Sequence, residues 1–199
     1  LRTPKLTGDT AGYGQVVELR PDIHPELGVL WHAQGPAISA PFVPFYLGAS
    51  DIPPEFKKHR YLTADESALF ISPDSDSPKQ KSSVSQSIES TRSAFRVFKR
   101  LFYLIMQHHE KFLPEVTETL DAFEARLIQQ QRGIEKTALT LYQVGEVELA
   151  RNYLTYFSHT EAMRSLRLAE ALSNSIEART KLLYDHDDLL GSPSPDVLW

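Results

Sequence analysis

The first half of the chain contains short apolar runs rich in β-branched and aromatic residues, separated by glycine and proline. Residues 14–20 (GQVVELR) form one run, and residues 29–32 (VLWH) form a second. This pattern predicts two adjacent β-strands. A third run, at residues 42–47, contains Pro44. Because proline cannot donate a ladder hydrogen bond, we expect this run at a sheet edge, in a bulge or as an extended wall.

The second half of the chain has the spacing of amphipathic helices. Residues 90–112 form the first helical series, and Pro114 is expected to end that helix and begin the next. The next series keeps its helical spacing as far as Leu141, and Gly145 predicts its C-terminal stop. The apolar stripe of the first helix contains Ala94, Phe98, Leu101 and Ile105.

A further helical boundary is predicted near Ser158. Residues 146–157 have helical spacing, and Ser158 is followed three residues later by Glu161, which is the spacing of a capping box. We therefore expect a new helix to begin here and to run to Tyr184. The short connections predict an antiparallel bundle, followed by a frayed tail at residues 185–199.

The serine-rich stretch between the two halves predicts their separation. Residues 72–89 are polar and contain two prolines, so they bury too little apolar surface to offset the entropy of ordering. We expect a flexible connection there. The predicted organisation is a β-containing part at 1–71, this connection, a helical bundle at 90–184 and the tail. The fold class is therefore α+β.

Composition and charge narrow the range of functions. The 199 residues are 41% hydrophobic and 24% charged, which is typical of a globular domain with a proper core. No apolar run is long enough to cross a membrane, so no membrane partner is expected. The net charge of −5 argues against a nucleic-acid partner, which would require clustered lysine and arginine.

Two clusters invite a metal-binding interpretation. His108 and His109 are adjacent, so on a helix they would point about 100° apart, and the HExxH spacing is missing. Residues 185–188 (DHDD) follow a predicted helix, where acidic side chains oppose the helix dipole. We expect structural or solvent-exposed roles for both clusters. No metal and no cofactor is predicted.

A nucleophile for self-contained hydrolysis is not evident in the sequence. The chain has no cysteine, and the G-x-S-x-G elbow of serine hydrolases does not occur. No motif places Ser39 against His24 or His32. The catalytic residues therefore stay unassigned within this chain.

The proline- and glycine-rich stretch at residues 28–54 contains rigid aromatic residues suited to lining an apolar pocket. Trp31, Phe42 and Tyr46 are the predicted substrate-binding residues, with Phe45 beside them. The alternative is that these aromatic side chains cover the helical bundle as part of the core.

Four segments resemble a known family. They are VELRPD at 17–22, GVLWHAQGPAISAPFVPFYLGASDIPPEF at 28–56, SAFRVFKRLFYLI at 93–105 and LARNYLTYFSHTEAMRSL at 149–166. In this order they resemble the C-terminal part of the dipeptidase A-type cysteine dipeptidases, which are N-terminal-nucleophile hydrolases. The most specific pieces are the W-x-A-x-G-P arrangement beginning at Trp31 and the segment LTYFSHTEA.

The resemblance implies an αββα sandwich, in which two stacked sheets lie between helical layers. It also implies a cysteine that autoproteolysis exposes, whose own α-amino group serves as the base. Leu1 is not a nucleophile, so we expect the nucleophile in a missing N-terminal segment and no activity in this chain alone. The family places an arginine near the thiolate, for which Arg2 or Arg20 could be considered, although an ordinary surface ion pair is expected of Arg20.

Two other functions stay open. The first is another linear-amide hydrolase of the same group, such as a penicillin or bile-salt acylase. The second is a non-enzymatic helical interaction module, which predicts a polar surface all round. A part of a larger enzyme predicts instead an unpaired sheet edge or an apolar patch. The expected partners are a short peptide substrate and the missing segment, and a homo-oligomer is left open.

Overall fold

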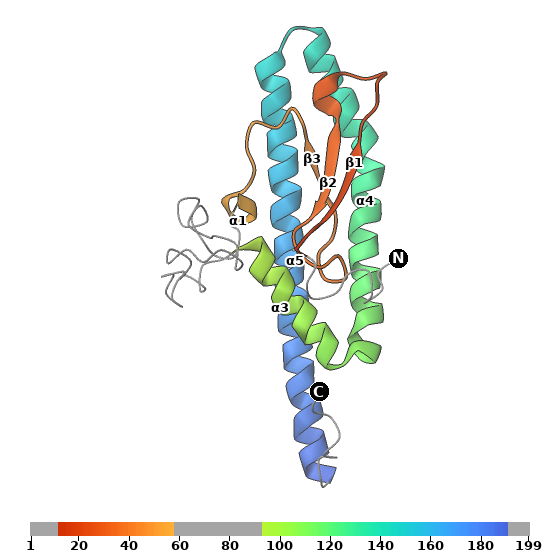
Figure 1. Ribbon diagram of the computed structural model, residues 1–199, viewed down its shortest axis with the longest axis vertical. Coiled ribbons are helices and arrows are strands. Elements are labelled where there is room, and N and C mark those ends of the chain that lie inside the picture. Colours follow the sequence, from red (N-terminus) through yellow and green to blue (C-terminus); the bar gives the residue numbers. More distant parts are fainter. Residues whose placement is uncertain (1–11, 58–92, 191–199) are drawn as a thin grey trace, which may run out of the picture.

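The computed structural model describes residues 12–57 and 93–190, with side chains described as far as residue 182. It shows a mixed fold with strands first and long helices after them (Figure 1). The elements are β1 (Gly14–Glu18), a 3-10 helix η1 (Pro25–Leu27), β2 (Val29–Ala33), β3 (Val43–Tyr46), α1 (Pro54–Lys57), α3 (Ala94–Gln107), α4 (His109–Gln143) and α5 (Val147–Leu190). The predicted α+β class is confirmed.

The three strands form one antiparallel sheet in the order β1-β2-β3. All three lie where the apolar runs predicted them, within one or two residues at each end. Pro44 belongs to β3, which lies at an edge of the described sheet, one of the three placements expected, and it lies opposite Trp31 of β2. An edge position suits proline because only one side of the strand needs ladder donors.

The long helices α4 and α5 form an antiparallel hairpin (Figure 1). Gly145 ends α4 as predicted, with a φ of +84° that an L side chain rarely adopts. The amide of Gly145 donates to the carbonyl of Tyr142 at 3.1 Å, and that of Glu146 donates to Leu141 at 2.9 Å. These bonds satisfy carbonyls at the end of the helix and reverse the chain.

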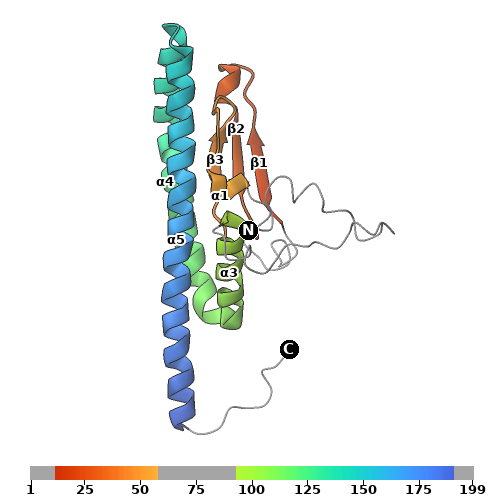
Figure 2. The ribbon, with the colours of Figure 1, turned by 90° about the vertical axis from the view of Figure 1, so that its left-hand side faces the viewer.

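The fold has two layers (Figure 2). The sheet and α3 lie on the same side of the α4–α5 pair, and no other described element lies on the opposite side of that pair. The core fills the space between the layers, where each fully buried large side chain contributes about 1.5–3 kcal/mol. Its fully buried members include Val29, Phe98, Leu101, Ile105, Phe112, Leu120, Leu127, Leu154, Leu166 and Ile176.

The break between α3 and α4 falls at His108, so the predicted boundary at Pro114 is wrong. His108 leaves the helical conformation, with φ −140° and ψ 62°, and its carbonyl accepts from the amide of Phe112 at 3.0 Å. Pro114 lies inside α4. Its missing amide leaves only the carbonyl of the exposed residue Glu110 without a helical donor, and solvent can satisfy that carbonyl so near the helix start.

The predicted helix boundary at Ser158 is also wrong, because α5 continues through it without interruption. Ser158 is buried, and its hydroxyl accepts from the amide of Tyr46 at 3.5 Å. Glu161 accepts from Arg126 and Arg164 rather than capping a helix. Both polar residues therefore make tertiary contacts. Their spacing matches that of a capping box, but it does not mark the start of a helix.

The tail begins later than predicted, because α5 remains helical as far as Leu190. A helical backbone at 185–190 continues the pattern of i to i−4 hydrogen bonds beyond the predicted end at Tyr184. The predicted connection at 72–89 lies outside the described residues, as do the first eleven residues and the last nine.

Candidate functional site

The two faces of the sheet have different surroundings. In an antiparallel ladder, directly opposed residues share a face, and successive residues alternate between faces. Val16 of β1, Trp31 of β2 and Pro44 of β3 are aligned, so they share one face. Tyr46 lies two residues beyond Pro44, and its ring centroid is 6.1 Å from that of Phe157 in α5. The face that carries Trp31 and Tyr46 is therefore the inner face, which packs on the hairpin.

A cavity of about 440 Å³ lies between this inner face and α4. It contains two of the three predicted substrate-binding residues, Trp31 and Phe42. Its other lining residues are Val16, Glu18, Glu124, Ile128 and Gln131. The cavity is thus apolar on its aromatic side and bears two carboxylates and an amide on the rest of its wall.

Hydrogen bonds fix the polar side of this cavity. The side-chain amide of Gln131 donates to Glu18 at 2.9 Å, which joins α4 to β1. A carboxylate oxygen of Glu124 accepts from the backbone amide of Phe42 at 2.9 Å. Both acidic side chains therefore act as structural acceptors, and sequence reasoning did not single out either of them.

Tyr46, the third predicted residue, does not line this cavity. Its side chain is 3% exposed and packs against Phe157. The described residues offer its hydroxyl no hydrogen-bond partner. Burial raises the pKa of Tyr46 above its usual value, and the nearby Glu135 carboxylate raises it further. Tyr46 therefore has the surroundings of a core residue.

Arg20 forms a half-buried ion pair with α4. Its guanidinium donates to the two carboxylate oxygens of Glu135 at 2.9 and 2.5 Å, and it lies 3.2 Å from Glu18. The hydrogen bond with Glu135 is the main cause that raises the pKa of Arg20. The ion pair expected of Arg20 is thus present, although it joins the sheet to α4 rather than lying loose on the surface. Arg2 lies outside the described residues.

The outer face of the sheet carries His32, whose two ring nitrogens both have polar neighbours. Nε2 lies 2.5 Å from the side-chain oxygen of Gln34, and Nδ1 lies 3.4 Å from the side-chain amide of Gln15. A second cavity, of about 310 Å³, opens beside them and is also lined by Leu30, Phe45, Ile52 and Phe56. Strand alternation was the signal that could have found it, because His32 must face away from Trp31.

Ser39 and His24 are used structurally. Ser39 is fully buried, and its hydroxyl donates to the carbonyl of Pro36 at 3.1 Å. The ring of His24 stacks on that of Tyr142, with centroids 3.9 Å apart. Neither histidine considered for a serine hydrolase contacts Ser39 through any described hydrogen bond.

Of the two clusters considered for metal binding, the structure describes the side chains of only the histidine pair. His108 lies at the junction of α3 and α4, with its ring edge-on to Phe112 at 6.1 Å. His109 begins α4 and is exposed. The side chains of residues 185–188 lie outside the description. Within the described part of the chain, no three histidine or acidic side chains are grouped as a metal site.

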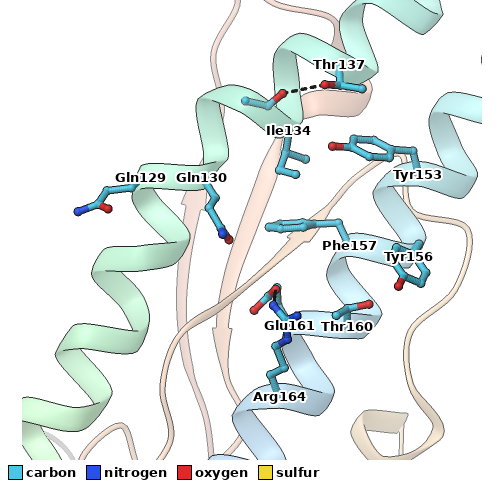
Figure 3. Close-up of a pocket in the computed structure, with 11 residues that line it drawn as sticks. Gln129, Gln130, Ile134, Thr137, Tyr153, Tyr156, Phe157, Thr160, Glu161 and Arg164 are labelled. Atoms are coloured by element: carbon cyan, nitrogen blue, oxygen red, sulfur yellow. Dashed lines mark hydrogen bonds and ion pairs between the residues drawn. The ribbon is translucent and has the colours of Figure 1, made fainter.

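A groove of about 620 Å³ runs between α4 and α5 on the side of the hairpin away from the sheet (Figure 3). Ile134 of α4 and the rings of Tyr153 and Phe157 of α5 point into it. Glu161 lies at one end, and its nearly buried carboxylate accepts from Arg126 at 2.5 Å and from Arg164 at 2.7 Å. Helical spacing predicted only a buried face here, so the sequence did not indicate this groove.

Comparisons with known proteins add no identification. No protein-family model matches the chain, and no curated protein or solved structure matches it significantly. The resemblance to cysteine dipeptidases therefore rests on the quoted motifs alone. Among the described residues, no helix combines the length and the hydrophobicity that crossing a membrane requires.

Proposed function

We propose that this chain is the C-terminal region of a cysteine-type N-terminal-nucleophile hydrolase that cleaves short peptides as a dipeptidase. The nucleophilic cysteine comes from polypeptide that precedes Leu1. The three strands form part of one sheet of an αββα sandwich, and the α4–α5 hairpin forms the helical layer behind that sheet. The motifs at 28–56 and 149–166 suggest this function, and the observation that supports it is the edge of β1, with which no described strand pairs.

The edge of β1 that no described strand pairs with carries two exposed valines. Val16 is 56% exposed and Val17 is 58% exposed, and successive residues of a strand point to opposite faces. Leu19, just beyond the strand, is also exposed. No described strand pairs with this edge. Finished sheets protect their edges with lysine, proline or bulges, so an edge that is apolar on both faces supports further pairing with polypeptide outside the description.

The described residues cover the outer face of the sheet only in part. Phe56 of α1 covers Phe45 of β3, with ring centroids 5.8 Å apart. Val17 and Leu30, which are paired across β1 and β2, share this face, and Val17 remains exposed. A second sheet packing about 10 Å away would bury it. An exposed apolar side chain on this face agrees with the enzyme hypothesis, which predicts an apolar patch where further polypeptide packs.

Activity measurements on two forms of the protein test the proposal. The chain produced together with its preceding polypeptide is expected to hydrolyse unblocked dipeptides, and the 199-residue chain alone is expected to be inactive. Replacing the exposed N-terminal cysteine of the longer form by alanine removes the nucleophile and is expected to abolish turnover. Turnover by the isolated chain, or a coding sequence with no cysteine before Leu1, overturns the proposal.

The same assay separates a dipeptidase from an acylase. A dipeptidase prefers substrates with a free amino group, whereas a penicillin or bile-salt acylase prefers an N-acylated amide. Comparing kcat/KM for a free dipeptide with that for its N-acylated form measures the difference in transition-state binding. A higher value for the acylated substrate would assign the chain to the acylases.

A further inference from the structure

One side of the α4–α5 hairpin carries a groove but no covering layer. The sheet and α3 occupy the other side, and no described element lies on this one (Figure 2). The groove contains apolar side chains from both helices, among them Ile134, Tyr153 and Phe157 (Figure 3). Such a surface on a long hairpin is wide enough for another pair of helices to pack against it.

Gly133 forms part of this groove, and its backbone carbonyl accepts a hydrogen bond from the hydroxyl of Thr137 at 3.0 Å. It lies in the interior of the 35-residue helix α4, where glycine is less favourable than alanine. A Cβ atom placed on Gly133 would meet no atom within 4 Å. No contact inside the described chain therefore requires glycine here. Its missing side chain leaves a notch in the surface of α4, which permits the close approach of another molecule.

Tyr156 lies on the wall of the groove that α5 forms, opposite Gly133, and its side chain projects from the surface. Its side chain is 72% exposed and points outward from α5, away from the ring of Phe157 (Figure 3). Leu149 lies seven residues, or two helical turns, before Tyr156 and is 52% exposed. The same side of the hairpin thus carries a notch on one helix and projecting apolar side chains on the other.

We infer that two copies of this chain associate through this side of the hairpin, with Tyr156 of each copy packed over Gly133 of the other. A twofold contact requires a surface that is complementary to itself, and a notch and a projection on one patch meet that requirement. The inference does not depend on the peptidase proposal, because the groove and the sheet lie on opposite sides of the hairpin.

Charge and size also fit a second copy. The charged residues that line the groove are Glu161 and Arg164, which pair at 2.7 Å, so two such surfaces do not repel each other. The hairpin is roughly 50 Å long over the 35 residues of α4 and roughly 20 Å wide. A contact over most of this side would reach the roughly 800 Å² per partner of a standard interface.

Sedimentation velocity over a range of concentrations tests the inference on the full chain. Gly133→Leu fills the notch with a residue that favours helix, and Tyr156→Ala removes the projection. Each is expected to raise the dimer dissociation constant more than about tenfold. Tyr103→Ala is the matched control, because Tyr103 is 54% exposed on α3, outside the groove. It is expected to leave the constant unchanged, and circular dichroism checks that all variants keep their helices.

Cross-linking places the contact directly, because the chain has no cysteine of its own. A mixture of the single variants Gly133→Cys and Tyr156→Cys is expected to form a covalent dimer on oxidation. A mixture of Gly133→Cys with Tyr103→Cys is not. A chain that stays monomeric up to about 100 μM, or a dimer that both groove variants leave intact, overturns the inference. Association that Val17→Lys abolishes and Gly133→Leu leaves intact belongs to the β1 edge and also overturns it.

Discussion

The carboxylate of Glu26 binds the guanidinium of Arg151 through two hydrogen bonds, to Nε at 2.9 Å and to Nη2 at 2.6 Å. The hydroxyl of Tyr142 donates to the same carboxylate at 2.7 Å. Because Glu26 belongs to η1 between β1 and β2, while Tyr142 and Arg151 flank the turn from α4 to α5, these bonds join the sheet to the tip of the hairpin. The bonds from Arg151, followed by that from Tyr142, lower the pKa of Glu26 from 4.5 to about 2.

This lowered pKa predicts a loss of stability in acid. A carboxyl group whose pKa is lower in the folded state stabilises the fold above its unfolded pKa and ceases to do so as the pH falls. The contribution of Glu26 is therefore expected to disappear between about pH 4.5 and pH 2. Chemical unfolding measured across this range should show a shallower pH dependence for Glu26→Gln than for the unmodified chain.

At neutral pH, Glu26→Gln is expected to lower the free energy of unfolding by about 1 kcal/mol, because the pair is partly open to solvent. Glu148→Gln is the control. Glu148 approaches the same arginine at 3.9 Å but is 87% exposed, so its removal should change neither the stability nor its pH dependence. Equal pH profiles for Glu26→Gln and the unmodified chain would contradict this account of the contact.

Gly48 is predicted to be intolerant of a side chain for a steric reason. A Cβ at this position would lie 2.8 Å from the hydroxyl of Tyr142 and 2.9 Å from Cβ of Glu26. Since the hydrogen bond between these two residues restricts their movement, Gly48→Ala should lower the free energy of unfolding by about 1–3 kcal/mol. Gly12→Ala, where a Cβ meets nothing within 4 Å, should be nearly neutral. Equal stabilities of the two variants would show that the contact relaxes at little cost.

The strands and the end of α4 could be predicted because the residues that determine them are neighbours in the sequence. The runs at 14–20 and 29–32 have β-prone residues bounded by turn formers, and both are strands. Gly145 stops α4 because a left-handed residue favours glycine whatever its neighbours are. Pro44 indicated an edge, a bulge or an extended wall for an equally local reason, since it lacks a donor, and the described sheet has it at an edge.

The predicted helix boundaries were wrong where contacts between distant parts of the chain determine the roles of the residues. Ser158 and Glu161 have the spacing of a cap, but Ser158 contacts Tyr46 of β3 and Glu161 contacts Arg126 of α4. Those partners lie far away in the sequence, so residue spacing alone cannot reveal them. The break between α3 and α4 falls at His108, six residues before Pro114, which lies inside α4.

For the candidate site, the alternation of side chains along a strand predicts which residues share a face of the sheet, but not which of them line a cavity. Trp31 and Tyr46 share the inner face of the sheet, as the register implies. Whether each lines a cavity depends on the helix above it. Tyr46 lies under Phe157 and is buried, while Trp31 lies at the cavity beside Ile128. The acidic residues Glu18 and Glu124 reach that cavity from β1 and α4, and no pattern along the chain connects them.

The substrate could bind on either face of the sheet, and the two locations predict different effects of substitutions on the kinetics. If the peptide binds in the cavity of Trp31 and Phe42, Trp31→Ala should raise KM by about tenfold with little change in kcat. If it binds between stacked sheets, His32→Ala should have that effect, because His32 lies on the outer face. Steady-state kinetics of the longer, active form distinguish them. Unchanged kinetics in Trp31→Ala would remove Trp31 and its cavity from the predicted site.

The central claim, that further polypeptide completes this sheet at β1, is tested most directly by amide hydrogen exchange. In the 199-residue chain alone, the β1 amides that do not pair with β2 should exchange rapidly, because they lie on an open edge. The same amides should become strongly protected when the preceding polypeptide is present. Rapid exchange at β1 in both forms would contradict the claim.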